Sequence, residues 1–454
     1  MKGDFTRFTF DPRKNFSRVL MQQGRVQLDA DWNEMAEMQL NFLRTLAADL
    51  IGPHGGPGDG FKIEAAKDAN NNDRPRDFSI HEGRYYVDGI QCASEGARLF
   101  SGQDGFTAEV FGDLGSNQPG TYLVYLDVWE RFITYIEDEQ EAGISIREVA
   151  LRGPDTAARS QVVSQVKCLA REFSDQDRAN LKDRNKGYDT FLKFLANAGV
   201  ATLGAGKLLA RAIKPPSGGD VACDIAPESR YRGAENQLYR VEIHKGGKLG
   251  EATFKWSRDN GSVVFAGAFA GTEATLEHLG RDGRFGLEPD GWVEIVDDDY
   301  VLQNRPALRN QPALLVQIER VVADDMKVIL KSSIPANVGQ TGKHPLLRRW
   351  DSPGEVKVEV PEKNNGWIPL EDGVEVKFQA APNDVFRSGD YWLIPARVAT
   401  GDVEWPGTRD NPLAAGPHGV EHHYAPLAII SLDAGGKVTA DPKDDLRRRW
   451  TPLA

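Results

Sequence analysis

The sequence predicts an α+β fold that is mainly β: an N-terminal amphipathic helix followed by several antiparallel β-sandwich or barrel-like units, with a helical insertion. Three observations predict it. A stripe of apolar residues at helical spacing opens the chain, short runs of β-branched and aromatic residues separated by turns fill most of the remainder, and a helical pattern lies between them. With 454 residues, the chain exceeds one hydrophobic core. These changes in pattern divide it into four parts: an N-terminal helix or attachment element (1–60), a small β domain (61–154), a helical insertion (155–229) and one or more β-rich domains (230–454).

The opening helix is predicted within the stretch "FSRVLMQQGRVQLDADWNEMAEMQLNFLRTLAADLIGPHGGPGDGF", residues 16–61. Asp31 and Glu34 have the spacing of a capping box, and Gly52 followed by Pro53 ends the helix. The glycine-rich segment "GPHGGPGDGF" is then expected to be a flexible connection. The apolar stripe of the helix consists of Leu28, Trp32, Met35, Phe42, Leu43, Leu46 and Leu50.

The second part reads as short strands. A turn is predicted at Glu82 and Gly83, and "TYLVYLDVWERFITYI" is interpreted as a pair of strands. The third part, from residue 155 to residue 216, reads mainly as helix, in the stretches "SQVVSQVKCLAREF" and "NKGYDTFLKFLANAGVATLGAGKLLARAIKP". The latter contains "ATLGAGKLL", which lacks the spacing of a phosphate-binding loop and has no strand before it.

Turn signals recur in the last part. Lys245-Gly246-Gly247 and Asn260-Gly261 are flanked by alternating apolar residues, and Asn-Gly is a strong signal for a β-hairpin. No period of 20 to 50 residues repeats, which argues against a solenoid or a propeller.

The formal net charge of -12 argues against a nucleic-acid-binding protein, although Arg447, Arg448 and Arg449 form a local basic run. Three scattered cysteines favour buried thiols in a reducing compartment over a disulfide framework, and none forms a CxxC pair. The start of the chain has no apolar segment of a signal peptide, and no window resembles a transmembrane helix. We therefore expect cytoplasmic synthesis without a signal peptide.

The best metal-binding pattern is "PHGVEHHYAP", which places His418, His422 and His423 close together. His418 and His422 would share a face only on a helix, and the surrounding glycines and prolines make a helix improbable, so hydrogen-bonded loop histidines are favoured. The acidic run Asp297–Asp299 lacks the spacing of a calcium loop and reads as a solvated strand end. We predict no metal and no cofactor.

Signatures of catalytic nucleophiles are absent from the sequence: it contains no GxSxG and no HExxH. The stretch "WSRDNGS" offers Ser257, Asp259 and Asn260, but the carboxylate and the amide bracket a turn and have a sufficient role in hydrogen-bonding their own backbone. A pair of carboxylates at workable separation occurs in any fold with 67 acidic residues, so it is weak support for a glycosidase. We predict that the protein is not an enzyme.

Seven tryptophans fall in the second half of the chain, several beside arginine or a turn. Core packing is favoured for each, and an interface role stays open for some, because tryptophan and arginine are enriched at interfaces. They are Trp256, Trp292, Trp350, Trp367, Trp392, Trp405 and Trp450.

Six separated blocks resemble, in order, an uncharacterised bacterial domain family associated with extracellular contractile injection systems, which are phage-tail-like particles. They include the opening stretch, "YLDVWERFITYIED", "EVALRGPDTAARSQVVSQVKC", "YRGAENQLYRVEIHKGG", "ATFKWSRDNGSVV" and "SGDYWLIPARVATGDVEWP". The segment "GRVQLDADWNE" is also similar to the start of some phage tail and baseplate proteins, although Asp31 and Trp32 replace their arginine and leucine.

The resemblance implies a structural, non-enzymatic component of such a particle, associated with its baseplate as an appendage, cage or fibre base. It also implies other particle subunits as partners, homo-oligomers, and an extracellular location after lysis or release. We expect Arg25, Trp32, Leu43, Leu46 and Leu50 to form the assembly interface. The alternative for this stripe is that it covers the chain's own β domain. The alternative functions are a carbohydrate- or cell-surface-binding module that reads a receptor, and an effector enzyme carried by the particle.

Overall fold

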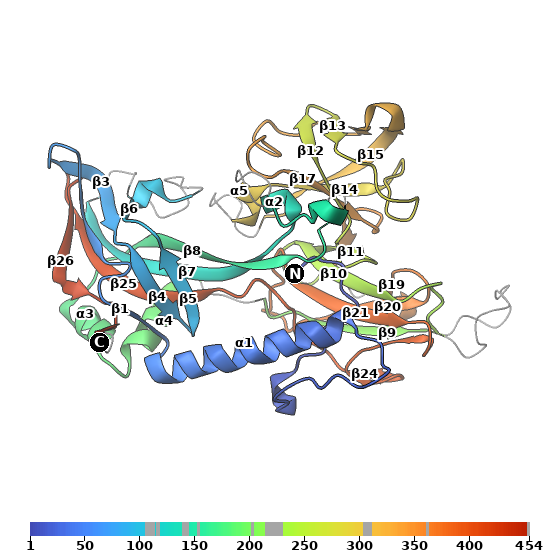
Figure 1. Cartoon of the computed structure of the whole chain (residues 1–454), viewed down its shortest axis with the longest axis horizontal. Helices are drawn as coiled ribbons and strands as arrows, with labels where there is room; N and C mark the ends of the chain where they lie inside the picture. The colour runs from blue at the N-terminus through green and yellow to red at the C-terminus, as the bar shows by residue number, and fades with distance from the viewer. Residues whose placement is uncertain are drawn as a thin grey trace.

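The computed structural model describes residues 1–104, 114, 119–138, 145–151, 155–200, 204–213, 230–302, 311–359 and 363–451. The predicted mainly-β class is confirmed (Figure 1), and one β unit is a closed barrel. Two β-rich regions lie at opposite ends of the molecule, and the long strands β7 and β8 extend between them (Figure 1). Helix α1 (Asp29–Ile51) runs along the lower edge of both regions.

The first region is built around a four-stranded sheet in the order β26-β25-β7-β8. A second four-stranded sheet, β27-β1-β4-β5, and a three-stranded sheet, β2-β3-β6, pack with it around a core that includes Phe61, Phe78 and Leu427. The strands are β1 (His54–Pro57), β2 (Ile63–Lys67), β3 (Asp73–Ile80), β4 (Gly83–Val87), β5 (Ile90–Ser94), β6 (Arg98–Leu99), β7 (Gly120–Ile133), β8 (Arg159–Ala170), β25 (His423–Leu432), β26 (Val438–Asp445) and β27 (Arg449–Trp450).

The second region contains a five-stranded sheet, β18-β11-β10-β21-β22, and two smaller sheets, β19-β20-β9 and β23-β24. Its core includes Phe254, Phe378 and Trp392. The strands are β9 (Lys207–Ala212), β10 (Gln237–Lys245), β11 (Thr253–Ser257), β18 (Val356–Lys357), β19 (Ile368–Pro369), β20 (Val374–Gln379), β21 (Tyr391–Arg397), β22 (Asp402–Val403), β23 (Gly407–Thr408) and β24 (Asn411–Pro412).

The closed barrel sits above this sheet (Figure 1), with its own core of aliphatic side chains and Phe265. Its strands follow the order β12-β13-β16-β15-β14-β17. They are β12 (Val264–Ala270), β13 (Glu273–Leu276), β14 (Trp292–Val296), β15 (Leu314–Val322), β16 (Lys327–Leu330) and β17 (Leu346–Trp350).

Helices are few in the described ranges. Besides α1 they are α2 (Tyr135–Asp138), α3 (Asp175–Lys182), α4 (Gly187–Asn197) and α5 (Asp298–Val301). Helix α4 packs its buried Phe191 and Leu195 against the four-stranded sheet, together with Leu123 and Ile429. The short 3-10 helices are η1 (Pro12–Lys14), η2 (Phe100–Gly102), η3 (Val149–Leu151), η5 (Ala323–Asp325) and η6 (Lys363–Gly366).

Much of the predicted helical insertion is strand, which corrects that interpretation. The stretch "SQVVSQVKCLAREF" forms most of β8, which pairs with β7 along twelve residues, and "KLLARA" forms β9, which pairs with β20. Sheet pairing overrides the local helical pattern because β-branched valines suit a half-buried strand. Only α3 and α4 are helical in the described part of this segment.

Three predictions about a strand pair, a hairpin turn and a connection also need correction. The stretch "TYLVYLDVWERFITYI" is one strand, β7, rather than a pair. Asn260 and Gly261 both have positive φ, of 53° and 65°, but this turn connects β11 to β12, which belong to different sheets and do not pair with each other. The segment at Gly55 is not a flexible connection, because β1 pairs with β4 and β27 and is largely buried. The Lys245-Gly246-Gly247 turn does join a hairpin, β10 and β11.

The predicted boundaries cut across paired strands. β7 precedes residue 154, yet it pairs with β8 and with β25, which comes some three hundred residues later in the chain. Residues 1–60 likewise contribute β1 to a sheet and Lys2 to a buried cluster at the barrel.

Candidate assembly interface

The N-terminal end of α1 is fixed by side-chain hydrogen bonds. The helix begins at Asp29, two residues before the predicted cap, so the prediction that Asp31 caps the helix with Glu34 is wrong. Asp31 lies in the first turn and accepts a hydrogen bond from the Leu28 amide at 3.4 Å, while Asp29 accepts one from the Thr6 amide at 2.8 Å. The N-terminal segment that contains Thr6 therefore holds the start of the helix by hydrogen bonds.

The middle of α1 is held by an ion pair and a close backbone contact. Arg44 Nη1 lies 2.9 Å from Glu130 Oε2 on β7, and both side chains are about one quarter exposed, at 26% and 24%. The backbone of Arg44 also packs on Gly89, in the turn between β4 and β5. A Cβ at Gly89 would lie 2.1 Å from the Arg44 carbonyl oxygen, and its φ of 77° also favours glycine.

The face of α1 that lies against the sheets combines two buried apolar residues with charged side chains. Only Ala30 and Met38 are buried among its residues. Burial, and then repulsion from Glu130, raises the pKa of Glu37, whereas Arg44 lowers it. Glu34 accepts a hydrogen bond from the hydroxyl of Thr9 on the preceding segment. The charged side chains of the helix interior thus sit between the helix and the rest of the protein.

The opposite face is apolar and exposed. The predicted interface residues Trp32, Leu43, Leu46 and Leu50 have exposed fractions of 63%, 60%, 43% and 78%. The alternative that this stripe covers the chain's own β domain is therefore wrong. Arg25, the fifth predicted residue, is also exposed, in the loop before the helix.

Further exposed apolar residues were missed by the sequence reasoning, most of them in the segment before α1. Eleven of the twenty-four large hydrophobic side chains that are exposed in the described ranges fall between residues 16 and 50, so this short segment concentrates them. The many apolar residues in "FSRVLMQQGRVQL" were the sequence signal that could have indicated them. We call the set the N-terminal apolar surface: Phe16, Leu20, Met21, Val26, Leu28, Trp32, Leu40, Phe42, Leu43, Leu46 and Leu50.

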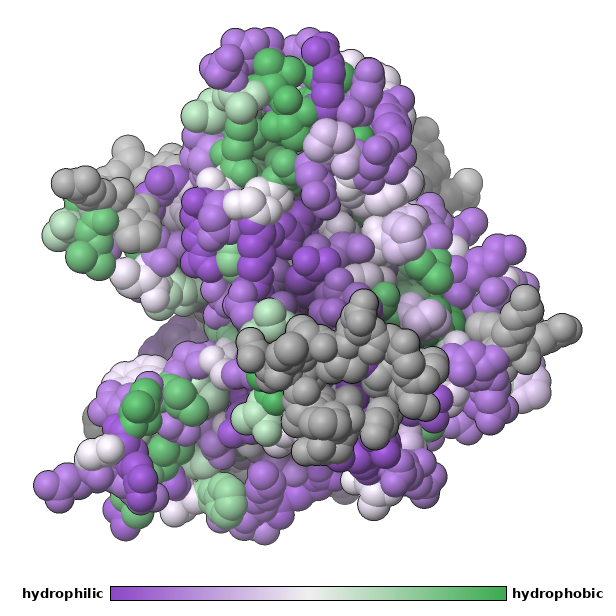
Figure 2. All heavy atoms as spheres, turned by 90° about the vertical axis from the view of Figure 1, so that its right-hand side faces the viewer, coloured by the Kyte–Doolittle hydropathy of each residue, from purple (hydrophilic) through white to green (hydrophobic). Residues whose placement is uncertain are grey.

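The end of the molecule formed by the barrel and the five-stranded sheet has a different surface. Figure 2 shows hydrophilic residues over most of it, with apolar residues in several separate patches, of which a large one lies on the barrel. Scattered patches of this kind are ordinary for soluble proteins, whereas a concentrated apolar segment marks an interaction site.

The three histidines of "PHGVEHHYAP" have different partners. His422 Nδ1 lies 2.7 Å from Asp127 Oδ1, and His423 Nδ1 lies 2.9 Å from Asp88 Oδ2. The ring of His418 instead lies beside Tyr391, with centroids 5.5 Å apart. Groups of three or more potential metal ligands do not occur among the described residues.

Two polar stretches have roles other than those predicted. The acidic run is not a solvated strand end: Asp297 caps α5 and accepts from the Gly339 amide, Asp298 pairs with Arg131 at 3.0 Å, and buried Asp299 pairs with Lys343 at 2.6 Å. In the Asn260 turn, Ser257 accepts a hydrogen bond from the Asp259 amide at 3.3 Å, but the side chains of Asp259 and Asn260 bond distant residues.

Asp259 pairs with Arg284 and Arg349 at 3.2 and 3.3 Å, instead of bonding its own backbone. The Asn260 amide donates to the carbonyl oxygen of Gly3 at 2.9 Å. The turn therefore ties the start of the chain and the barrel together.

A buried cluster of charged side chains joins the five-stranded sheet to the barrel. Lys255 on β11 pairs with Glu294 on β14 and lies 3.5 Å from Glu242 on β10. Glu242 also accepts from Arg240 at 2.7 Å and from Lys2 at 2.9 Å. All these side chains except Lys2 are at most 4% exposed.

The opposite charges of this cluster stabilise one another. Burial would raise the pKa of Glu294, but the combined attraction of Lys255 and Lys2, with the hydrogen bond from Lys255, outweighs it and lowers the pKa to about 2. Burial lowers the pKa of Lys2 to about 8, although Glu242 opposes this. Both carboxylates stay ionised beside their cations, so the cluster acts as an ionic joint between two β units.

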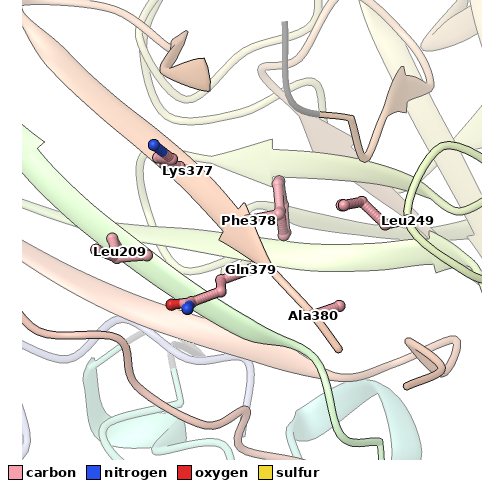
Figure 3. Close-up of a pocket in the computed structure, with 6 residues that line it drawn as sticks. All are labelled: Leu209, Leu249, Lys377, Phe378, Gln379 and Ala380. Carbon is pink, nitrogen blue, oxygen red and sulfur yellow. The ribbon is translucent and has the colours of Figure 1, made fainter. Parts of the chain in front are cut away.

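A hollow of about 310 Å³ lies beside β20 (Figure 3). Most of its described lining is aliphatic or aromatic, and Lys377 is the one charged side chain among these described residues. Lys377 donates to the carbonyl oxygen of Asn365 at 2.9 Å. Its lining residues are Leu209, Leu249, Lys377, Phe378, Gln379 and Ala380.

The tryptophans of the second half of the chain mainly pack in the cores. Trp256, Trp350, Trp367 and Trp392 are at most 7% exposed, as predicted for core residues. Trp450 is 36% exposed and lies beside Tyr86. Of the predicted buried thiols, Cys92 and Cys168 are buried and free, and Cys223 lies outside the described residues.

A family model described as "Family of unknown function (DUF6519)" matches residues 1–203 and 190–438. No curated protein and no solved structure matches the chain. In the described part of the chain, no helix is long and apolar enough to cross a membrane.

Proposed function

Because the chain belongs to the DUF6519 family, whose description names no function, we propose a role from the geometry of α1: the protein is a structural, non-enzymatic subunit that joins a larger assembly through its N-terminal apolar surface. The observation that carries this proposal is the orientation of α1. Its ion pair, Arg44 with Glu130, faces the protein, and Trp32, Leu43 and Leu50 face solvent.

This orientation opposes the usual arrangement of a surface helix, in which the apolar stripe faces the core. Leaving large apolar side chains in water forgoes about 1.5–3 kcal/mol for each one that could be buried. A partner that covers the surface recovers this free energy, so the arrangement suits a subunit whose helix is completed by assembly.

The nature of the assembly follows from the resemblance of the six sequence blocks. We propose a phage-tail-like contractile injection particle, in which the protein is a baseplate-associated appendage, cage or fibre base. The β regions would then lie outside the contact between subunits. They would form a rigid body, because their cores and the buried charge cluster at Lys255 are made by residues of this chain alone.

The alternative of a receptor-reading module depended on exposed tryptophans around a β-sheet face. Four of the tryptophans that could have supplied it, including Trp350 and Trp392, are in the cores. The alternative of an effector enzyme depended on a metal-bound histidine group or on converging carboxylates in a deep pocket. His422 and His423 bond separate carboxylates, and the carboxylates Glu242 and Glu294 are already paired with cations.

The proposal is tested by incorporation into the particle. The chain with a C-terminal affinity tag is expressed in its source cells, and the particles are purified by sedimentation. We expect the tagged chain to sediment with the particles and Leu43→Asp to remain at the top of the gradient.

The matched control is Leu413→Asp, because Leu413 is 57% exposed, close to the 60% of Leu43, but lies at β24. Equal incorporation of Leu43→Asp and Leu413→Asp would overturn the proposal, as would absence of the unmodified chain from particles.

A further inference from the structure

We propose that α1 pairs in parallel with α1 of a second copy of this chain, as a short coiled coil. This inference rests on the proposed function, since it names the partner of the same surface. The exposed side of α1 repeats with alternating steps of four and three residues, which is the spacing that keeps one seam facing a partner helix. We call these residues the seam: Trp32, Ala36, Gln39, Leu43, Leu46 and Leu50.

Between Trp32 and Leu50 the seam and its flanks carry one charged residue, Asp49, next to the last seam residue. The positions beside the seam are Met35, Leu40, Phe42 and Ala47, with Asn33 and Asp49 only at its two ends. The charged side chains Glu34, Glu37 and Arg44 lie on the other side, toward the protein. A surface without lysine or arginine argues against docking on an anionic membrane and suits a second apolar helix.

The exposed area is large enough for a stable contact. The large side chains of α1 that are 36% to 78% exposed are Trp32, Leu40, Phe42, Leu43, Leu46 and Leu50. They offer on the order of 700 Å², close to the area of about 800 Å² that each partner contributes to a standard interface.

Gln39 decides the direction of the pair. In a parallel pair, Gln39 meets Gln39 of the second copy, and the two amides can hydrogen-bond each other inside the seam. In the antiparallel register that matches apolar residues best, Gln39 meets Leu43, and its amide would be buried without a partner. Such a group costs about 1–3 kcal/mol, and a polar residue in a seam commonly fixes the register.

The test is disulfide cross-linking of the purified full-length chain. Leu46→Cys is made in a Cys223→Ser background and oxidised mildly. In a parallel pair the two introduced thiols at position 46 share one layer of the seam. In the antiparallel register position 46 faces position 36, and the two introduced thiols are ten residues apart along the axis, about 15 Å, too far for a disulfide.

The control is Thr45→Cys, which is exposed and adjacent in sequence but lies outside the seam. Cys92 and Cys168 are buried, and burial raises the pKa of the Cys92 thiol to about 12, so neither competes. We expect about tenfold more covalent dimer from Leu46→Cys than from Thr45→Cys.

Cross-linking of a mixture of Ala36→Cys and Leu46→Cys, without cross-linking of Leu46→Cys alone, would overturn the parallel arrangement. Absence of covalent dimer in every case, from a chain that sediments as a monomer, would overturn the pairing itself. If that monomer still joined particles through Leu43, the proposed function would stand and the partner would be a different chain.

Discussion

Arg44 Nη1 lies 2.9 Å from Glu130 Oε2, and this ion pair turns the apolar stripe of α1 away from the protein. Glycine at position 89 lets the helix backbone approach the β4–β5 turn, where any Cβ would clash with Arg44. The helix is thus seated by polar contacts and a close approach of backbone, and its largest side chains remain exposed.

Loss of the ion pair should loosen α1 with little effect on global stability. We expect Arg44→Ala and Glu130→Ala to show a coupling of about 0.5–1 kcal/mol in a double-mutant cycle, because both side chains are partly exposed. Hydrogen exchange should quicken in α1 and not in β7. Quickened exchange across β7 as well would show that the helix is integral to the sheet core.

Charge on the exposed stripe should leave the fold intact. We expect Leu43→Asp to change the free energy of unfolding by less than about 0.5 kcal/mol, like Leu413→Asp, because neither side chain is buried. Urea unfolding of dilute protein measures this. A loss of several kcal/mol in Leu43→Asp alone would mean that the stripe packs on the chain's own core.

The buried charge cluster should be sensitive to loss of one cation. We expect Lys255→Met to lower the free energy of unfolding by about 3–5 kcal/mol, because it leaves Glu294 and Glu242 buried with less positive charge. Lys248→Met, on the exposed connection of the same hairpin, is the control and should be nearly neutral. The double variant Lys255→Met with Glu294→Gln should recover part of the loss in urea unfolding, and no recovery would contradict a direct coupling.

The stability of the protein should depend on the ionisation of Asp390. Burial raises the pKa of Asp390 from its ordinary value of 3.8 to about 6. The backbone amide of Arg387, which donates to the carboxylate at 3.0 Å, opposes this rise. The folded state therefore binds the proton more tightly than the unfolded state. The resulting stabilisation is complete below about pH 4 and is lost as the pH rises through 6.

Asp390→Asn keeps an oxygen acceptor and removes this titration. The free energy of unfolding of the variant, taken relative to that of the unmodified chain, should rise by about 1–3 kcal/mol from pH 4 to pH 8. Thermal unfolding at both pH values provides the comparison. Parallel pH profiles for the two proteins would show that Asp390 does not titrate in this window.

Local signals predicted the elements whose pattern and environment agree. The helix around Leu43 and its end at Gly52 could be read from apolar spacing and from a glycine, because both are properties of the segment itself. Its capping residue was misjudged, because the bond that Asp29 accepts comes from Thr6, far outside the helical window.

Long-range pairing decided the elements that the sequence misrepresented. The glycines of β1 read as a flexible linker, but Gly56 packs so closely on β4 that a Cβ would lie 2.6 Å from the Arg84 carbonyl oxygen. The segment that forms β8 has a helical sequence pattern, and its pairing with β7 makes it a strand. The direction that the α1 stripe faces could not be predicted either, because the same spacing serves a core or a partner. Long-range contacts decide it, among them Arg44 with Glu130 and the close approach of Gly89.

Sedimentation velocity of the purified chain across a range of concentrations, with Leu43→Asp and Leu413→Asp beside it, measures whether α1 mediates self-association. We expect the unmodified chain and Leu413→Asp to associate reversibly as concentration rises, while Leu43→Asp remains a folded monomer. Identical sedimentation of all three proteins, whether as monomers or as oligomers, would contradict pairing through the exposed face of α1.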